Sequence, residues 1–401
     1  MEQIEWWDAA RVRGARCVVA GAGALGNEVV KNLVMLGWGE VVVVDFDTVE
    51  ESNLSRSVFF GQADVGRPKA PALAAAAGRL NPDCRVLGLD GDLRLLLGAG
   101  LVQRSDVVFG CLDNLGGRVA LSQLARQAGR LMIDGGLTTW EGTVQLFGPD
   151  TADAPQPCFA CGLSSADVEE LALRQSCLAY ERRALAEGGV PTTPTLTSTV
   201  AALMVQEALK YLHRDRHDQR SALGRELRID MANGRFWNHA LPIDPDCVLH
   251  REPAAPDAAA GPDAGDSWRK VLAHCRTSAR LPEGVLQLPA RLLLSWECPV
   301  CGRSEQVMRA HAADGPPVCP HCDADVIPLF AAHVEGGEPW IDLSPAEMGV
   351  PPWTWLELRA EGAVVTFELS GTRGPLPEAA GSEAAGSEAA GSDAPEGGSP
   401  W

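Results

Sequence analysis

Short apolar runs and helical apolar periods alternate along the first 250 residues. The run at 16–20 is short and β-rich, and it leads directly into glycines. Apolar positions then recur near helical spacing from Val29 to Leu36, and Gly37 ends this predicted helix before a second strand at 41–44. A strand, a helix and a further strand make a βαβ unit. We therefore expect an α/β fold with a Rossmann-like, doubly wound sheet.

The turn between the first strand and the helix reads G-A-G-A-L-G, with glycines at Gly21, Gly23 and Gly26. Asp45 follows the second strand about twenty residues later, where a carboxylate can accept both ribose hydroxyls of a nucleotide. This pattern indicates a nucleotide site, but by itself it fits NAD, FAD or ATP.

Three polar segments after this unit favour ATP. They read D-F-D-T-V-E-E-S-N-L-S-R at 45–56, G-R-P-K at 66–69 and C-L-D-N at 111–114. When a carboxylate attacks the α-phosphorus of ATP, fixed cations or a metal must neutralise the phosphate charge. Arg56 and Lys69 can supply those cations, and Asp113 is a candidate Mg²⁺ ligand. A nicotinamide oxidoreductase needs none of these groups, and no proton-donating His or Tyr after the unit supports one.

In this order, the motifs resemble those of the ThiF/MoeB/HesA family, relatives of ubiquitin-activating enzymes, over roughly residues 12–250. The resemblance implies a ThiF-type adenylation domain at 1–250 and a homodimer. It assigns the phosphates to Gly21, Gly23 and Gly26, the ribose to Asp45, the phosphate chain to Asn53, Arg56 and Lys69, and Mg²⁺ to Asp113.

The implied reaction is ATP-dependent adenylation of the C-terminal carboxylate of a ubiquitin-like or sulfur-carrier protein with a Gly-Gly terminus, with release of pyrophosphate. A conjugating enzyme is a further candidate partner. Family members usually carry R-x-x-R-Q near the start, whereas this chain reads M-E-Q-I-E-W-W-D, with Arg11 and Arg13 as the nearest substitutes. A non-catalytic nucleotide- and zinc-binding scaffold is therefore the alternative hypothesis.

Six of the twelve cysteines fall into three C-x-x-C pairs, which favours metal over disulfides. We predict two zinc sites. The first set is Cys158, Cys161, Cys247 and His250, in which C-V-L-H stands where the family usually has a second C-x-x-C. The second set has zinc-ribbon spacing and comprises Cys298, Cys301, Cys319 and Cys322. Pairing Cys158 and Cys161 with Cys298 and Cys301 instead leaves Cys319 and Cys322 unexplained.

Cys177 lies in a predicted crossover loop at about 163–193, flanked by arginines that favour a reactive thiolate. Its position is similar to the crossover-loop cysteine of activating enzymes, which implies acyl transfer from AMP to this thiol. A buried cysteine without chemistry is the competing interpretation.

The remaining chain divides by composition. Residues 251–267 are rich in alanine, proline, glycine and aspartate and are predicted to be a linker, and 268–373 a smaller zinc-ribbon and β-rich domain. This domain is compatible with partner docking and with a structural lid. Residues 374–401 repeat E-A-A-G-S and are predicted to be disordered. A net charge of −19 argues against nucleic-acid binding. Without a signal peptide or an apolar span, we expect no membrane association and a cytoplasmic location.

Overall fold

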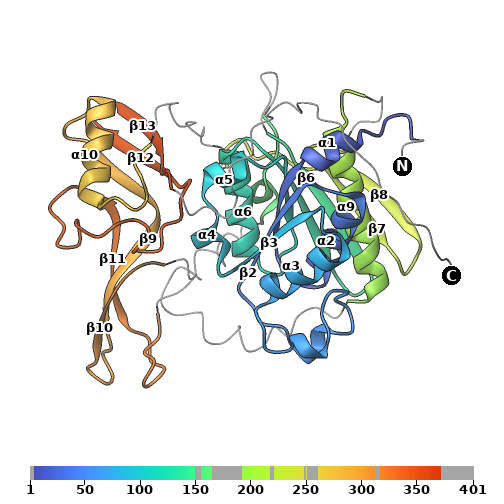
Figure 1. The fold of residues 1–401 in the computed structure, drawn as a ribbon, viewed down its shortest axis with the longest axis horizontal. Helices are drawn as coiled ribbons and strands as arrows, with labels where there is room; N and C mark the ends of the chain where they lie inside the picture. Colours follow the sequence, from blue (N-terminus) through green and yellow to red (C-terminus); the bar gives the residue numbers. More distant parts are fainter. Residues whose placement is uncertain are drawn as a thin grey trace, which may run out of the picture.

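The computed structural model describes residues 4–149, 155–164, 192–216, 221–247, 250, 261–311 and 317–371. These residues form two bodies, each built on its own β-sheet (Figure 1). No helix among them combines the length and the apolar character needed to cross a bilayer.

The first body contains an eight-stranded sheet in the order β3-β2-β1-β4-β5-β6-β7-β8. Its first five strands are parallel and the last three antiparallel. The strands are β1 (Arg16–Ala20), β2 (Glu40–Asp45), β3 (Arg85–Asp90), β4 (Val107–Gly110), β5 (Leu131–Leu137), β6 (Glu141–Phe147), β7 (Arg225–Asp230) and β8 (Arg235–Ala240). The register aligns Val18 of β1 with Val42 and Val108, so β-branched side chains fill the centre of the sheet.

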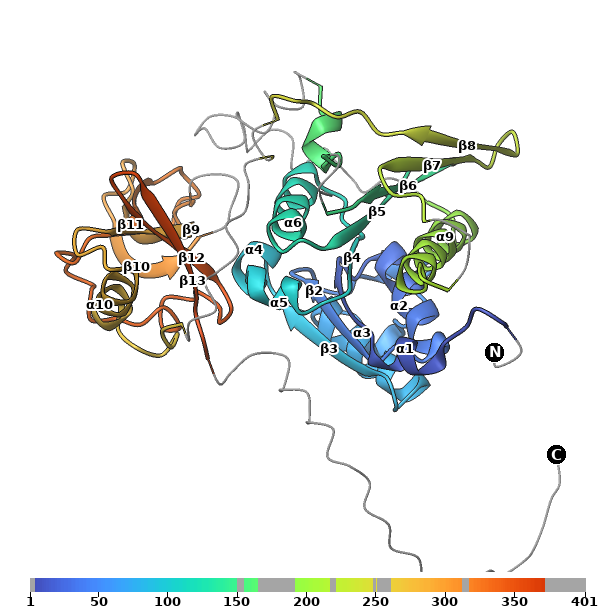
Figure 2. The same cartoon turned by 90° about the horizontal axis from the view of Figure 1, so that it is seen from above.

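Helices cover both faces of this sheet, as predicted for a doubly wound fold (Figure 2). Alternate residues of β1 divide between two hydrophobic clusters, with Val19 on the side of α2, α3 and α9 and Val18 on the side of α4, α5 and α6. The helices are α1 (Ala9–Gly14), α2 (Ala24–Leu36), α3 (Lys69–Leu80), α4 (Leu93–Leu96), α5 (Ala99–Gln103), α6 (Leu115–Gln127) and α9 (Pro194–Leu212), with 3-10 turns η1 (Glu51–Asn53), η2 (Gln62–Asp64) and η3 (Phe159–Gly162). Gly37 ends α2 in the left-handed conformation, with a φ of 78°, as its sequence position indicated.

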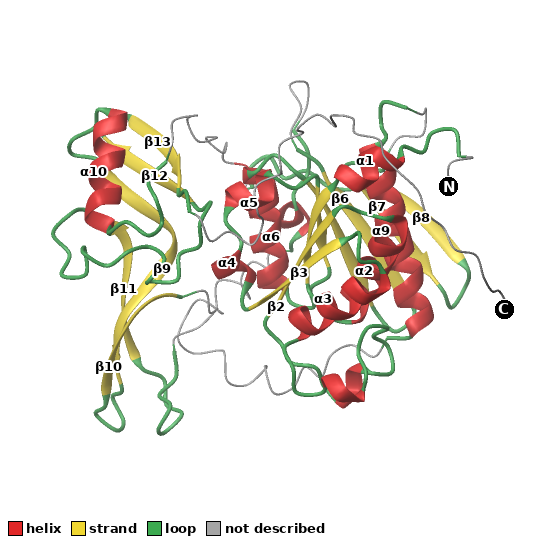
Figure 3. Cartoon of the chain, viewed as in Figure 1, coloured by secondary structure: helices red, strands yellow, loops and turns green. Residues whose placement is uncertain are grey.

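The second body contains a five-stranded antiparallel sheet and one helix, α10 (Trp268–Ala279) (Figure 3). Its strands are β9 (Val285–Glu297), β10 (Ser304–Ala310), β11 (Ile327–Val334), β12 (Trp355–Ala360) and β13 (Ala363–Glu368). The end of the predicted linker packs against this sheet: Ala264 donates its N–H to Ser370 O (2.7 Å), and Ser370 donates to Pro262 O (2.8 Å). Residues 261–267 therefore belong structurally to the second body.

The two bodies meet where α5 of the first contacts the chain before β12. The Gly100 N–H donates to Trp353 O at 2.9 Å. Arg104 donates to Glu368 at 2.8 and 3.1 Å, and its guanidinium carbon lies 5.3 Å from the Trp353 ring centroid. A Cβ on Gly98 would lie 2.5 Å from the Trp353 carbonyl. This close backbone approach explains the glycine, and it fixes the contact between the bodies.

Candidate functional site

In the turn after β1, each glycine is present for its own structural reason. Gly21 has a φ of +100°, and a Cβ there would lie 2.3 Å from Cys111 O. A Cβ on Gly26 would lie 1.9 Å from Gly21 O, so both glycines are required by the packing of α2 against the strands. Gly23 faces open space, because nothing lies within 4 Å of its Cβ position, and it caps the N-terminus of α2. The open approach to this helix N-terminus suits an anionic phosphate.

The buried Asn27 holds this turn in place. Its Nδ2 donates to Ala22 O (2.8 Å) and Gly23 O (3.1 Å), and its Oδ1 accepts from the Phe59 N–H (3.0 Å). Asn27 was not predicted from the sequence, although a polar residue on the buried face of an otherwise apolar helix was a usable signal. Asn27 joins the glycine turn to the segment that follows Arg56.

Asp45 ends β2 directly beside the glycine turn. Its two carboxylate oxygens accept from the backbone N–H groups of Ala22 (2.6 Å) and Asp47 (2.7 Å). Burial raises the pKa of Asp45, and the two backbone donors partly oppose that shift. The carboxylate thus fixes the turn, and each oxygen retains a lone pair that can accept from a ribose hydroxyl.

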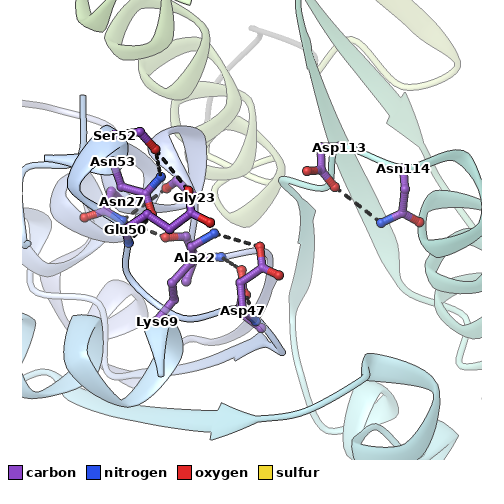
Figure 4. Close-up of polar contacts among 11 residues, drawn as sticks. Ala22, Gly23, Asn27, Asp47, Glu50, Ser52, Asn53, Lys69, Asp113 and Asn114 are labelled. Atoms are coloured by element: carbon purple, nitrogen blue, oxygen red, sulfur yellow. Dashed lines mark hydrogen bonds and ion pairs between the residues drawn. The ribbon is translucent and has the colours of Figure 1, made fainter. Parts of the chain in front are cut away.

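Lys69 begins α3 and points toward the same edge of the sheet. Its Nζ forms an ion pair with Asp47 Oδ2 at 2.7 Å, and its backbone N–H donates to Asp47 O at 2.8 Å (Figure 4). Only 12% of the Lys69 side chain is exposed, whereas 47% of Asp47 is exposed. The ion pair holds the ammonium group at the site.

Arg56 and Asn53 lie on the segment between β2 and α3. Within the described part of the chain, the Arg56 guanidinium has no hydrogen-bonding or ion-pair partner. Asn53 Oδ1 accepts from the Glu50 N–H (3.0 Å) and stabilises the 3-10 turn η1. Arg56 is therefore unpaired among the described residues, and Asn53 has a local structural role.

Asp113 follows β4 and lies across from the Lys69–Asp47 pair in Figure 4. Its side chain is exposed and receives one long contact, from Asn114 Nδ2 at 3.4 Å. Asn114 caps α6 by accepting from the Gly117 N–H at 2.7 Å. The carboxylate of Asp113 is thus available to an external cation.

A buried pair that the sequence analysis missed lies behind Asp113. Arg118 donates to Asp134 Oδ2 at 2.7 Å, and Asp134 is 1% exposed. Asp134 Oδ1 has no hydrogen-bonding partner among the described residues, and burial raises the pKa of Asp134 to about 6 despite the charge of Arg118. No local motif marked this pair, because Asp134 comes from the next strand of the sheet.

The two candidate N-terminal arginines differ. Arg11 donates to Leu212 O at 2.8 Å and forms an ion pair with Asp215, so its guanidinium is engaged within its own chain at the end of α9. Arg13 is exposed.

The first predicted zinc set is brought together in space. The ligand atoms of Cys158, Cys161, Cys247 and His250 all lie within 4.8 Å of one another. Cys158 Sγ lies 3.7 Å from Cys161 Sγ and 3.6 Å from Cys247 Sγ. Tetrahedral zinc with Zn–S bonds of about 2.3 Å places thiolates about 3.8 Å apart, so this donor set fits zinc.

The second set is equally compact and lies in the second body. Cys298 Sγ is 3.5 Å from Cys322 Sγ, and Cys301 Sγ is 3.6 Å from Cys319 Sγ. The backbone N–H of Cys301 lowers the pKa of the Cys298 thiol. Each set draws on one body alone, which rules out the alternative pairing of Cys158 and Cys161 with Cys298 and Cys301. Cys177 lies outside the described residues.

The first body is thus an α/β fold in which an open helix N-terminus, Lys69 and the exposed carboxylate of Asp113 share the carboxyl edge of a parallel sheet, with Arg56 on the segment that follows β2. The ThiF family matches residues 4–249, and the chain belongs to this family.

Several relatives match the same part of the chain. The SAMP-activating enzyme E1 of Haloferax volcanii is 32% identical, with 60% of this chain and 81% of the relative covered. The molybdopterin-synthase adenylyltransferase of Salmonella typhimurium is 29% identical, with 59% of this chain and 88% of the relative covered. The sulfur carrier protein adenylyltransferase of Thermus thermophilus is 33% identical, with 50% of this chain and 70% of the relative covered. These relatives are named as adenylyltransferases and activating enzymes, and the chain is an enzyme of this class.

Proposed function

We propose that this enzyme uses Mg·ATP to adenylate the C-terminal carboxylate of a small ubiquitin-like or sulfur-carrier protein. The observation that carries the proposal is the set of groups at the carboxyl edge of β1, β2 and β4. Gly23 leaves the N-terminus of α2 open, Lys69 pairs with Asp47, and the exposed Asp113 lies across from that pair (Figure 4). Arg56 adds a cation on the segment between β2 and α3. The name of one relative, the sulfur carrier protein adenylyltransferase of Thermus thermophilus, supports the choice of substrate.

In the reaction, a carboxylate oxygen of the carrier attacks the α-phosphorus, and the bond from that phosphorus to the bridging oxygen of pyrophosphate breaks. Arg56 and Lys69 bind phosphate oxygens and stabilise the charge that develops on them. Asp45 orients the ribose, and Asp113 would hold Mg²⁺, which would supply further neutralisation of the phosphate charge. The products are the acyl adenylate and pyrophosphate.

We propose acyl transfer to Cys177 as the second step. Its thiolate attacks the acyl carbon, the bond from carbon to the AMP oxygen breaks, and AMP leaves with the electron pair. The flanking arginines in the sequence support a thiolate at this position. The enzyme is further proposed to act as a homodimer, which light scattering on the purified chain tests.

Exposed apolar side chains at the same edge suit the docking of the carrier. Trp140 follows β5 and is 60% exposed, and Phe236 on β8 is 55% exposed. The Met231 N–H donates to Trp140 O at 2.9 Å, so the β5–β6 and β7–β8 turns form one surface. Because β5 and β7 end at the edge that carries Asp113, a carrier seated there directs its terminus toward the nucleotide.

The test is carrier-dependent exchange of labelled pyrophosphate into ATP. Lys69→Ala and Asp113→Ala should each lower exchange by at least about a hundredfold, since each removes a charged contact to the phosphates or their metal. Arg67→Ala and Asp83→Ala are matched controls on exposed charged residues, and they should retain exchange. Exchange that persists at the normal rate in both site variants contradicts the proposal, as does the absence of exchange in the unchanged enzyme.

A further inference from the structure

The turn at residues 158–161, which carries two ligands of the first zinc set and is called the first zinc knuckle below, packs on α6. This helix follows the loop that carries Asp113. Phe159 lies between the ligands Cys158 and Cys161, and its N–H donates to Ser122 Oγ on α6 at 3.0 Å. Ser122 is 2% exposed, so the acceptor of this hydrogen bond is buried. The hydrogen bond therefore ties the knuckle to α6.

The Phe159 ring also touches a charged group of that helix. The guanidinium carbon of Arg118 lies 5.9 Å from the ring centroid, within the range of cation–π contacts. The ring also packs edge-on against Phe147, with centroids 6.0 Å apart. Phe159 thus supports Arg118 from the side of the knuckle.

Arg118 uses its donors to hold the loop that carries Asp113. Its Nε and Nη2 donate to Leu112 O at 3.0 and 2.7 Å, and Nη2 also donates to Gly135 O at 3.1 Å. Because Nη1 donates to Asp134, all three nitrogens of the Arg118 guanidinium have partners within the protein, in contrast to those of Arg56. Leu112 immediately precedes Asp113, so the clamp sets the position of the exposed carboxylate.

We propose that Arg118 is a positioning residue for the Mg²⁺-binding carboxylate and that the first zinc knuckle acts on the nucleotide site through Phe159. The inference rests on the proposed function, in which Asp113 holds Mg²⁺. The zinc knuckle then fixes α6 and Arg118, Arg118 fixes Leu112, and Asp113 faces the metal. Asp45, Arg56 and the glycine turn lie outside this chain of contacts. The coupling therefore changes how much Mg²⁺ strengthens nucleotide binding, and it leaves nucleotide binding without Mg²⁺ unchanged.

The experiment measures binding of a non-hydrolysable ATP analogue by calorimetry, with saturating Mg²⁺ and with EDTA. The readout is the affinity with Mg²⁺ divided by the affinity with EDTA. Arg118→Lys keeps the charge beside Asp134 but lacks the planar set of donors that reaches Leu112 and Gly135 together. It should lower the ratio by about tenfold and keep the EDTA affinity within about twofold.

Phe159→Leu keeps an apolar side chain in the knuckle but removes the ring from Arg118. It should lower the ratio in the same direction by about threefold. Phe147→Leu is the matched control, because it removes the other aromatic contact of Phe159 without touching Arg118. It should leave the ratio unchanged even if it lowers the melting temperature. The zinc content of each variant shows that the metal itself remains.

The outcomes separate this inference from the proposed function. If the unchanged enzyme shows no Mg²⁺-dependent binding, the proposed function and this inference both fail. If it does, and Arg118→Lys keeps the full ratio, the inference alone is overturned. Equal losses with Mg²⁺ and with EDTA also overturn it, because they indicate general damage to the fold.

Discussion

Lys69 Nζ lies 2.7 Å from Asp47 Oδ2, and this ion pair places a largely buried ammonium group at the proposed nucleotide edge while its partner faces solvent. Asp47 also accepts the backbone N–H of Lys69. The carboxylate therefore acts on the position of the lysine, and the lysine is the group that can reach a phosphate.

This relationship predicts unequal effects of two substitutions. Lys69→Ala should raise the KM for ATP by at least about tenfold, because a charge-assisted hydrogen bond to phosphate is lost. Asp47→Asn should keep the KM within about threefold, since the ammonium group and its backbone hydrogen bond remain. Steady-state kinetics at saturating Mg²⁺ measure both. A loss with Asp47→Asn as large as that with Lys69→Ala would contradict this expectation and show that the ammonium group depends on the Asp47 charge for its position.

Asp134 predicts an unusual pH dependence of stability. Its pKa rises from the ordinary value of 3.8 to about 6 in the folded protein, so the folded state binds this proton more tightly than the unfolded chain does. The stabilisation that Asp134 contributes by binding this proton is complete below about pH 4 and is lost as pH rises through about 6. This stabilisation amounts to about 3 kcal/mol.

Urea unfolding of the unchanged enzyme and of Asp134→Asn tests this. The difference between their unfolding free energies, unchanged minus variant, should fall as pH rises from 4 to 7. Asp83→Asn removes an exposed carboxylate and should show no such slope. A difference that stays constant or rises with pH means that Asp134 is ionised throughout.

The two thiol sets predict two independently bound zinc ions per chain. Cys161→Ser should remove the zinc of the first body, and Cys322→Ser that of the second, each leaving one ion. A structural zinc site contributes about 10 kcal/mol of folding free energy, so each variant should destabilise its own body. Elemental analysis with thermal melts measures this. A single substitution that releases both ions contradicts two separate sites.

The sequence predicted those parts of the protein that depend on local spacing. The βαβ unit follows from apolar periodicity and glycine position, and the thiol pairs follow from C-x-x-C spacing. Arg118 and Asp134 escaped notice because only the order of β4 and β5 brings them together. Gly98 escaped notice for a related reason, since the chain that approaches it belongs to the other body.

The contact between the bodies gives a further test. A Cβ on Gly98 would meet the Trp353 backbone, which cannot rotate away, so Gly98→Ala should separate the two bodies. Gly78→Ala is the control, because nothing lies within 4 Å of its Cβ position in α3, and helix propensity should make it stabilising by about 1 kcal/mol. Small-angle scattering should show a larger radius of gyration for Gly98→Ala alone. Identical scattering of both variants indicates that the bodies are not held at this contact.

The proposed carrier surface predicts a separation of two binding constants. Trp140→Ala removes a large exposed ring at the nucleotide edge, and such anchors commonly dominate protein interfaces. It should raise the KM for the carrier by about tenfold or more and leave the KM for ATP unchanged, because no phosphate or ribose contact is altered. Val364→Ala, on the second body, is the matched control for loss of an exposed apolar side chain and should change neither constant. If Trp140→Ala weakens ATP binding equally, the ring supports the nucleotide site and the carrier binds elsewhere.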